Sequence, residues 1–478
     1  MKKLLLLIGG IFLLLIAVLL FNTLMVSSSQ PQYDEVQPME ISNNAILNFQ
    51  KAIQFPTISY TDRSRMDTAA FENFLEYIKG AYPLFHENLE RELFNYTPLY
   101  TWKGSDPNAP ALVMMGHYDV VPVDSNTIDQ WEAGPFSGEI KDGSVYGRGT
   151  MDDKINVIAA LEAVETLLEK GYQPRNTIYL SFGHDEEIGG DEGAKKVAEH
   201  LKAKGVPISF AIDEGGFIAS EEITQTKGPI AMVNTGEKGY VSYRLTIHTD
   251  GGHSSAPPED NTIGSLAKAI TALEANQFPY RMLPVMEAQL EKMAPAMDGF
   301  FMRMVMANPW LFGSFMAEFA NAHTTTAPTI IEGGVKDNVI PTQASVVVNF
   351  RIMPGETGEM IEKHIAETVN DERISIEKYD ILNEASPVSD HESDSYKLLE
   401  RTIIEMFPEV TVTPGLLGGG TDSKHFIGVA DQVYRFYPTR INPECMSCFH
   451  GNNEHISANN YKETIQFNMQ LIKNFCEL

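Results

Sequence analysis

The sequence predicts an α/β protein: a mostly parallel sheet with helices on both faces, plus an inserted α+β (ferredoxin-like) domain. Short, wholly apolar runs typical of buried parallel strands alternate with segments of helical apolar spacing, which is the pattern of a sheet covered on both faces. Further along the chain, strands of a second type alternate apolar with polar residues, as expected where one face stays exposed. A length of 478 residues leaves room for about two to four domains.

An apolar segment precedes the globular part of the chain. Two lysines are followed by an apolar run over residues 4–21, which continues less purely to Val26 and, as a helix, can cross a hydrocarbon core of roughly 30 Å. A cleaved signal peptide has a shorter apolar core and small residues at its cleavage site, and the residues ahead of Ser27 do not fit that pattern. We therefore expect a membrane anchor and linker over 1–32, with the lysines inside and the body exported to a periplasmic, extracellular or lumenal space. The alternative is a cleaved segment and a secreted body.

The large domain begins with residues 33–237. The run over 111–115 ends at a glycine and has the composition of a buried strand, and similar runs follow twice. Segments of helical character fill the intervals between these runs. We expect strands at 111–115, 177–182 and 210–212, with helices at 156–170 and 192–204.

The inserted domain is expected over residues 238–386, and the α/β pattern returns over 387–478 with a helix at 395–406. The elements of the inserted domain follow in the order strand, helix, strand, helix, strand. They are predicted at 240–249, 262–275, 345–351, 356–370 and 374–379. Between its two halves, residues 278–323 are rich in Met, Phe and Ala. We expect this insert to form a helical hairpin packed on the inserted domain, with a membrane-dipping element as the alternative.

Composition excludes several classes of protein. A formal charge of −28 argues against a nucleic-acid binder, because a phosphate backbone would be repelled. Three cysteines exclude a scaffold built on disulfides. Cys445 and Cys448 lie close to His450 and His455, but this spacing is too compact for a structural zinc site. A disulfide between the two cysteines, or two buried thiols, are the remaining interpretations.

Five short segments carry acidic or imidazole side chains, four of them just beyond a predicted strand or turn. They are Gly116-His117-Tyr118-Asp119, residues 146–154, residues 183–190, Ile212-Asp213-Glu214-Gly215-Gly216 and residues 449–454. Each has a purely structural interpretation: a lone His-x-Asp pair is common, an Asp before a helix is a frequent N-cap, and an acidic loop is often only solvated. Together they form an oxygen-rich set with two imidazoles. Such a set suits two zinc ions that share one carboxylate, with an adjacent Glu free to act as a general base.

With these motifs the sequence resembles the M20 metallopeptidases, a family of dinuclear zinc aminoacylases and carboxypeptidases. The resemblance extends from about Asn44 to the C-terminus and includes residues 53–59, Trp131 with the Pro-Phe-Ser-Gly that follows it, and residues 143–154. The subgroup of carboxypeptidase S and the N-fatty-acyl-amino-acid synthase/hydrolases is the most similar, because it shares Glu237-Lys238-Gly239 and a long helical insert.

The resemblance implies a metal centre of two zinc ions, which Co²⁺ or Mn²⁺ can replace. Carboxylates and imidazoles are among the ligand types that zinc takes from proteins, and a shared carboxylate would link the two ions. His117 and Asp213 would hold one ion, Glu187 and His450 would hold the other, and Asp152 would bridge them.

The resemblance also implies catalytic and substrate-binding residues. Glu186 would be the general base for a water molecule at the zinc centre, and Asp119 would orient His117 through its second ring nitrogen. The inserted domain would be a lid whose His253 stabilises the oxyanion of the tetrahedral intermediate. Four further positions match residues that bind substrate: Asn338, Arg351, Gly420 and Thr421.

The activity implied by the resemblance is hydrolysis of the amide bond of N-acyl-amino acids, or removal of the C-terminal residue of small peptides. One alternative is a dipeptidase that acts on unblocked dipeptides, and another is a metal-dependent binding protein without catalytic activity on the same fold. An apolar insert beside a membrane anchor favours long acyl chains. The chain is expected to be a monomer or a lid-mediated homodimer.

Overall fold

The largest sheet in the computed structural model, which describes residues 1–379 and 382–477, has ten strands. Their bounds are β1 Glu90–Phe94, β2 Thr97–Trp102, β3 Ala111–His117, β6 Ile178–Gly183, β7 Ile208–Asp213, β8 Phe217–Ala219, β9 Ile230–Glu237, β16 Thr411–Leu417, β17 Gln432–Arg435 and β18 Arg440–Ile441. The order is β1-β2-β6-β3-β7-β17-β9-β8-β18, and β16 pairs with β9. At the centre β6, β3, β7 and β17 run parallel, while β2 and β1 extend one edge antiparallel. The predicted mostly parallel sheet is confirmed.

Helices cover both faces of this sheet because its central strands are apolar on both sides. In β3, Leu112 and Met114 belong to a core with α5 (Lys154–Glu169) and α15 (Ala458–Glu477). Val113 and Met115 belong to a second core with α6 (Ala194–Lys204). The first core also includes α2 Ala45–Ile53, α3 Thr68–Ala81, α4 Pro83–Asn88 and α13 Asp394–Met406.

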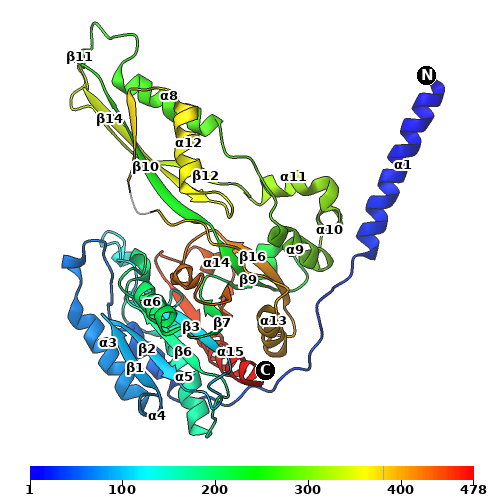
Figure 1. Cartoon of the computed structure of the whole chain (residues 1–478), viewed down its shortest axis with the longest axis vertical. Helices are drawn as coiled ribbons and strands as arrows, with labels where there is room; N and C mark the ends of the chain where they lie inside the picture. Colours follow the sequence, from blue (N-terminus) through cyan, green and yellow to red (C-terminus); the bar gives the residue numbers. More distant parts are fainter. Residues whose placement is uncertain (380–381, 478) are drawn as a thin grey trace.

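The inserted domain has a sheet of its own, with four antiparallel strands in the order β12-β14-β10-β15 (Figure 1). Its elements are β10 Gly239–His248, α8 Thr262–Ala275, β12 Thr325–Gly333, β14 Gln343–Ile352, α12 Gly358–Val369 and β15 Ile374–Lys378. Residues such as Val241, Leu266, Val348 and Ile361 form a separate core between this sheet and its two helices. The inserted α+β domain is thus confirmed. The edge strand β12 was not predicted, because most of its residues are exposed and show no apolar alternation.

The insert packs differently from the prediction. It forms α9 (Pro284–Met293), α10 (Phe300–Met306) and α11 (Pro309–Phe319). The prediction placed this hairpin on the inserted domain alone, but α9 contacts β16 of the large sheet. Val285 and Met286 cluster with Met353 of the inserted domain and with Leu416 of β16. The insert therefore bridges the two domains.

An apolar helix, α1 (Lys2–Met25), stands apart from the body in Figure 1. It is long and apolar enough to cross a membrane, a property that it shares with signal sequences. Its C-terminal end contacts α10, where Leu19 and Thr23 are buried. The predicted linker that follows is bound to the body, because the Gln30 side chain donates to the carbonyl oxygen of Val410 and accepts from the backbone N–H of Val412.

Candidate metal centre

Three neighbouring parallel strands end at the same edge of the large sheet and bring acidic and imidazole side chains together. β3 ends at His117, β6 is followed by Glu186 and Glu187, and β7 is followed by Glu214. Ligands bind in open α/β sheets at this carboxyl edge, where loops leave the sheet and side chains of separate strands can converge.

A small sheet completes the cluster. β4 (Ile140–Lys141) pairs with β5 (Ser144–Tyr146), and β5 pairs with β19 (His455–Ser457), so the loops that carry Asp152 and His450 lie side by side. Glu454 joins them: its Oε1 accepts from the backbone N–H groups of Gly149, Met151 and Asp152. The Arg148 guanidinium donates to its other carboxylate oxygen at 2.7 Å.

Asp152 lies between the two imidazoles. Its Oδ1 is 3.0 Å from His117 Nε2, and its Oδ2 is 3.0 Å from His450 Nε2. Glu187 Oε2 is 3.4 Å from the same His450 nitrogen. Glu187 Oε1 is buried and has no hydrogen-bond partner within the described part of the chain. One oxygen of Asp152 therefore faces each imidazole, as a bridging carboxylate would, and Glu187 has a free oxygen for a cation.

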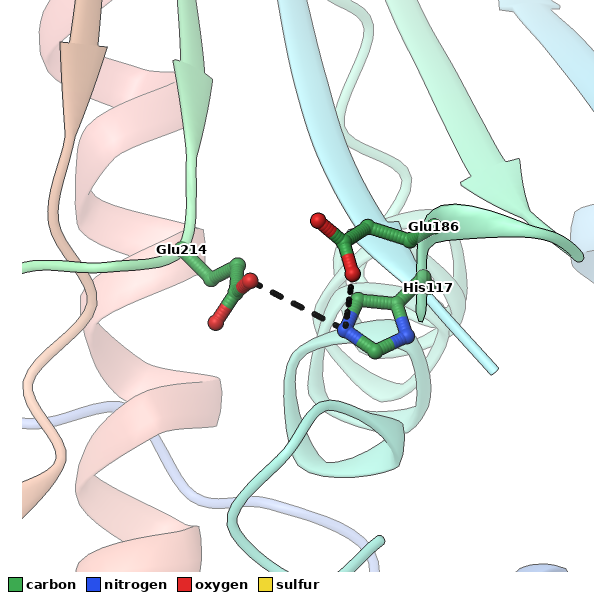
Figure 2. Close-up of side chains that lie close together, drawn as sticks. All are labelled: His117, Glu186 and Glu214. Atoms are coloured by element: carbon green, nitrogen blue, oxygen red, sulfur yellow. Dashed lines mark ion pairs between the residues drawn. The ribbon is translucent and has the colours of Figure 1, made fainter. Parts of the chain in front are cut away.

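Glu186 and Glu214 also approach His117, as Figure 2 shows. Glu186 Oε2 is 3.9 Å and Glu214 Oε1 is 3.8 Å from His117 Nε2. His117 forms one potential metal-binding group with Glu186 and Glu214, and a second with Asp152 and Glu187.

The structure places Glu214, and not the predicted ligand Asp213, beside His117. One carboxylate oxygen of Asp213 accepts a hydrogen bond from the backbone N–H of Ser423 at 2.8 Å, and Asp213 belongs to neither of the potential metal-binding groups. The next residue, Glu214, points toward His117 instead and lines the cavity described below. Successive side chains at a strand end point in opposite directions, so only one of this pair can face the cluster.

The carboxylates of the cluster attract positive charge. Burial would lower the pKa of His117, but its hydrogen bonds to two aspartates outweigh this effect and raise the pKa well above its usual range. Hydrogen bonds to Asp152 and Glu187 raise the pKa of His450 to about 10. Burial raises the pKa of the Glu187 carboxyl to about 7, and that of Glu186 well above its usual range. Four carboxylates with two imidazoles carry surplus negative charge, which divalent cations would offset.

Asp119 holds the first two loops in position. Its Oδ1 is 3.3 Å from His117 Nδ1, and its Oδ2 accepts from Ser59 Oγ at 2.6 Å. It also accepts from the backbone N–H groups of Glu186 and Glu187, each at 3.2 Å. His117 Nδ1 also lies 3.0 Å from the Asp119 backbone carbonyl oxygen, so Asp119 contacts His117 through its backbone and its side chain.

A cavity of about 360 Å³ separates the cluster from the base of the inserted domain. Asp152, Glu186, Glu187, Glu214 and His450 line one side, and Lys238, Tyr240, Arg351, Asn383, Glu384, Gly420 and Lys424 line the other sides. Arg351 lies 4.9 Å from the centre of the Tyr240 ring, and it forms no ion pair with any described residue. Thr421 lies below the surface, where its backbone N–H donates to Glu237 Oε2.

Two predicted residues lie elsewhere. His253 belongs to β11 (Gly252–His253), which pairs with β13 (Val339–Ile340), directly after Asn338. Figure 1 shows β11 at the end of the inserted domain that is remote from the large sheet. Neither His253 nor Asn338 lines the cavity in this arrangement of the domains.

The sequence also contained residues whose role was missed. Glu454 was noticed only as part of an acidic segment, and its three backbone contacts depend on the β5–β19 pairing. Lys238 and Lys424 were also missed as residues that line the cavity. Lys424 lies four residues after Gly420, and Lys238 belongs to the Glu-Lys-Gly motif, so their positions next to these motifs could have indicated this role.

Comparison with known proteins gives sequence relatives over most of the chain. The family model described as peptidase family M20/M25/M40 matches residues 113–474. The N-fatty-acyl-amino acid synthase/hydrolase PM20D1.1 of Danio rerio is 38% identical over 443 residues, covering 89% of this chain and 85% of that protein. A carboxypeptidase S-like protein of Dictyostelium discoideum is 35% identical over 485 residues, covering 97% of this chain and 92% of that protein.

Solved structures share the fold at lower identity. The M20 family metallo-carboxypeptidase Sso-CP2 from Sulfolobus solfataricus superposes with a TM-score of 0.70 at 20% identity, covering 91% of this chain and all of that chain. Human carnosine dipeptidase 1 gives a TM-score of 0.63 at 15% identity, covering 91% of this chain and 96% of that chain. The family match, the relatives and the shared fold agree with the cluster at the sheet edge. The chain is an enzyme of peptidase family M20.

Proposed function

We propose that this enzyme hydrolyses the amide bond that joins an acyl group to an amino acid with a free α-carboxylate. The observation that carries the proposal is the cavity that Arg351 shares with the acidic cluster. Arg351 is free of ion pairs among the described residues, and a guanidinium binds a carboxylate through two parallel hydrogen bonds. A substrate held there by its carboxylate would place its amide bond toward Glu186.

The cluster fits two divalent cations, for which we propose Zn²⁺, replaceable by Co²⁺ or Mn²⁺. His117, Asp152 and Glu214 would hold one ion, and Asp152, Glu187 and His450 would hold the other. The fit rests on the partnerless Glu187 oxygen and on the two Asp152 oxygens, each 3.0 Å from an imidazole nitrogen. When bound, such ions act as Lewis acids that polarise a carbonyl and lower the pKa of water.

Glu186 is the proposed general base. Its backbone is fixed by Asp119, and its carboxylate faces the cavity beside His117. Burial raises the pKa of Glu186, so its carboxylate readily takes a proton from the attacking water and can return it to the departing amine. His253 remains the proposed oxyanion donor, although it needs a movement of the lid or a second chain to reach this cavity.

We propose N-acyl-amino acids as the substrate class because relatives with about 38% identity are named for them. The carboxypeptidase S-like relative supports C-terminal residues of short peptides as a second group of substrates with the same free carboxylate. We further propose that α1 anchors the enzyme in a membrane and that the body is exported.

Replacing Glu186 tests the mechanism. The variant Glu186→Gln should lose about 10²- to 10⁴-fold in kcat on an N-acyl-amino acid, because Gln cannot accept the proton of water. Its metal content, measured by elemental analysis, should equal that of the wild type. A Glu186→Gln enzyme that keeps its activity would rule out this residue as the base.

Replacing Arg351 tests substrate recognition. We expect Arg351→Ala to raise KM for an N-acyl-amino acid by about 10-fold or more, since a charge-assisted pair is worth roughly 1.5–3 kcal/mol. The matched control is the carboxamide form of the same substrate, which lacks the negative charge and should show almost no change. Equal effects on both substrates would contradict a carboxylate contact at Arg351. A panel with unblocked dipeptides then separates acylase from dipeptidase activity.

A further inference from the structure

Two helices of the insert, α10 and α11, expose six large aromatic and aliphatic side chains. We call this group the aromatic face; it consists of Phe300, Phe301, Trp310, Leu311, Phe315 and Phe319. Trp310 is 59% exposed and Phe319 is 69% exposed. Arg303 and Glu318 are the only charged residues within these two helices. An exposed apolar surface of this kind marks a site of interaction with a protein or a membrane.

α10, which carries Phe300 and Phe301 of the aromatic face, contacts α1 where α1 meets the body (Figure 1). Asn308, between α10 and α11, accepts a hydrogen bond from the Asn22 side chain at 2.8 Å and donates to the carbonyl oxygen of Leu19. The Arg303 guanidinium donates to the carbonyl oxygen of Val26 at 3.0 Å. The hairpin is therefore bound to the last two turns of the apolar helix.

The linker restricts how far the body can move from α1. Val26 and Gln30 are four residues apart, which span at most about 14 Å. Gln30 is bonded to the backbone of Val410 and Val412, at the start of β16, and the Val36 N–H donates to the carbonyl oxygen of Glu405. If α1 lies in a bilayer, these contacts hold the hairpin close to the end of α1 that faces the body.

We propose that the aromatic face is a second membrane contact, seated in the interfacial layer of the same bilayer that α1 spans. This inference rests on the proposed anchor. The bilayer fits better than a protein partner because α1, once inserted, brings it to the hairpin without any further binding event. Trp is enriched where membrane proteins cross the interface, and large apolar side chains bury favourably in the acyl boundary. The two helices carry one positive and one negative side chain between them, so the contact depends on apolar burial and not on anionic lipid.

The three tryptophans of the chain make the contact measurable. Trp102 and Trp131 are buried in the large domain, whereas Trp310 is exposed on the aromatic face. The full-length chain is reconstituted in phosphatidylcholine vesicles whose acyl chains carry bromine near the headgroups. We expect these lipids to quench up to about one third of the emission, because one of three tryptophans meets them. Vesicles with bromine near the bilayer centre should quench less, and added anionic lipid should change neither result.

Substitutions show which residues produce the tryptophan quenching. Trp310→Phe should abolish the quenching, and Phe315→Ser with Phe319→Ser should reduce it at least twofold. Leu93→Ser replaces a residue of similar exposure on β1, on the far side of the body, and should leave it unchanged. If the wild type is quenched no more than Trp310→Phe, the proposal is overturned. If Trp310 emission then changes with protein concentration, the aromatic face binds a second protein chain instead.

Flotation of the wild-type chain with the vesicles separates the two proposals. A chain that floats without Trp310 quenching keeps its anchor but refutes the membrane contact of the hairpin. A chain that does not float refutes the anchor, and the contact with it.

Discussion

At the end of β7, two adjacent carboxylates have opposite surroundings. Asp213 is almost fully buried and is bonded to the backbone of Ser423, whereas the Glu214 side chain reaches the cavity beside His117. Burial raises the pKa of both carboxyl groups, but only Glu214 lies beside other carboxylates in the cavity. Separate substitutions of Asp213 and Glu214 can therefore show which of the two carboxylates binds the metal ion.

We expect Glu214→Gln to bind about one zinc ion fewer than the wild type, because it removes one of the carboxylate oxygens proposed to hold the ion beside His117. Asp213→Asn should keep both ions, since an amide oxygen can still accept from the Ser423 N–H. Zinc is measured per chain by elemental analysis after gel filtration. Metal loss in Asp213→Asn with full occupancy in Glu214→Gln would restore Asp213 as the ligand.

At the scale of elements, α5 carries a buried carboxylate with no part in the proposed chemistry. Glu162 accepts hydrogen bonds from Asn48 Nδ2 on α2 at 2.7 Å and from the Tyr82 hydroxyl at 3.0 Å. Burial raises its pKa, although both hydrogen bonds oppose the shift. A carboxyl whose pKa is raised by folding stabilises the folded state below its unfolded pKa, and this contribution is lost as the pH rises through the folded pKa.

Glu162→Gln should therefore melt at a higher temperature than the wild type at pH 8 and at the same temperature near pH 4. Each tenfold change in proton affinity between the folded and unfolded states corresponds to about 1.4 kcal/mol of this difference. Thermal melting followed by fluorescence between pH 4 and pH 8 measures it. Glu274→Gln, at an exposed position of α8, is the control and should show no such trend. If the difference in melting temperature between Glu162→Gln and the wild type became smaller as the pH rises, it would contradict the inference that burial raises the pKa of Glu162.

The elements differ in how well their sequences predict them. The bounds of α8 were predicted without error, since its apolar spacing is regular and its N-cap Asn261 accepts from the Gly264 N–H. β12 was missed because an exposed edge strand needs no apolar pattern. The choice between Asp213 and Glu214 and the role of Glu454 depend on side-chain direction and on the β5–β19 pairing, which no local pattern specifies. The same holds for the packing of α9 on β16, which joins segments more than a hundred residues apart.

At the scale of the whole molecule, the position of His253 raises the question of how the site is completed. β11 lies at the far end of the inserted domain, and the insert fastens the near end of that domain to the large sheet (Figure 1). Met353 packs against Val285 and Met286, and Lys238 Nζ donates to the carbonyl oxygens of Asn321 and His323. A closing rotation of the lid would have to break this apolar and polar contact. We therefore expect the His253 of a second chain, in a lid-mediated dimer, to reach the cavity.

Complementation between inactive variants tests this expectation. Glu186→Gln keeps His253, and His253→Ala keeps Glu186, so a mixed dimer holds one complete site if the lid acts on its partner. When the two variants are co-expressed in equal amounts, half of the dimers are mixed, and about one quarter of all sites should be active. If His253 served the cavity of its own chain, every site would lack one of the two groups and the mixture would stay as inactive as its components. Gel filtration of the wild type should show a dimer, and an active monomer would also exclude the exchange of lids.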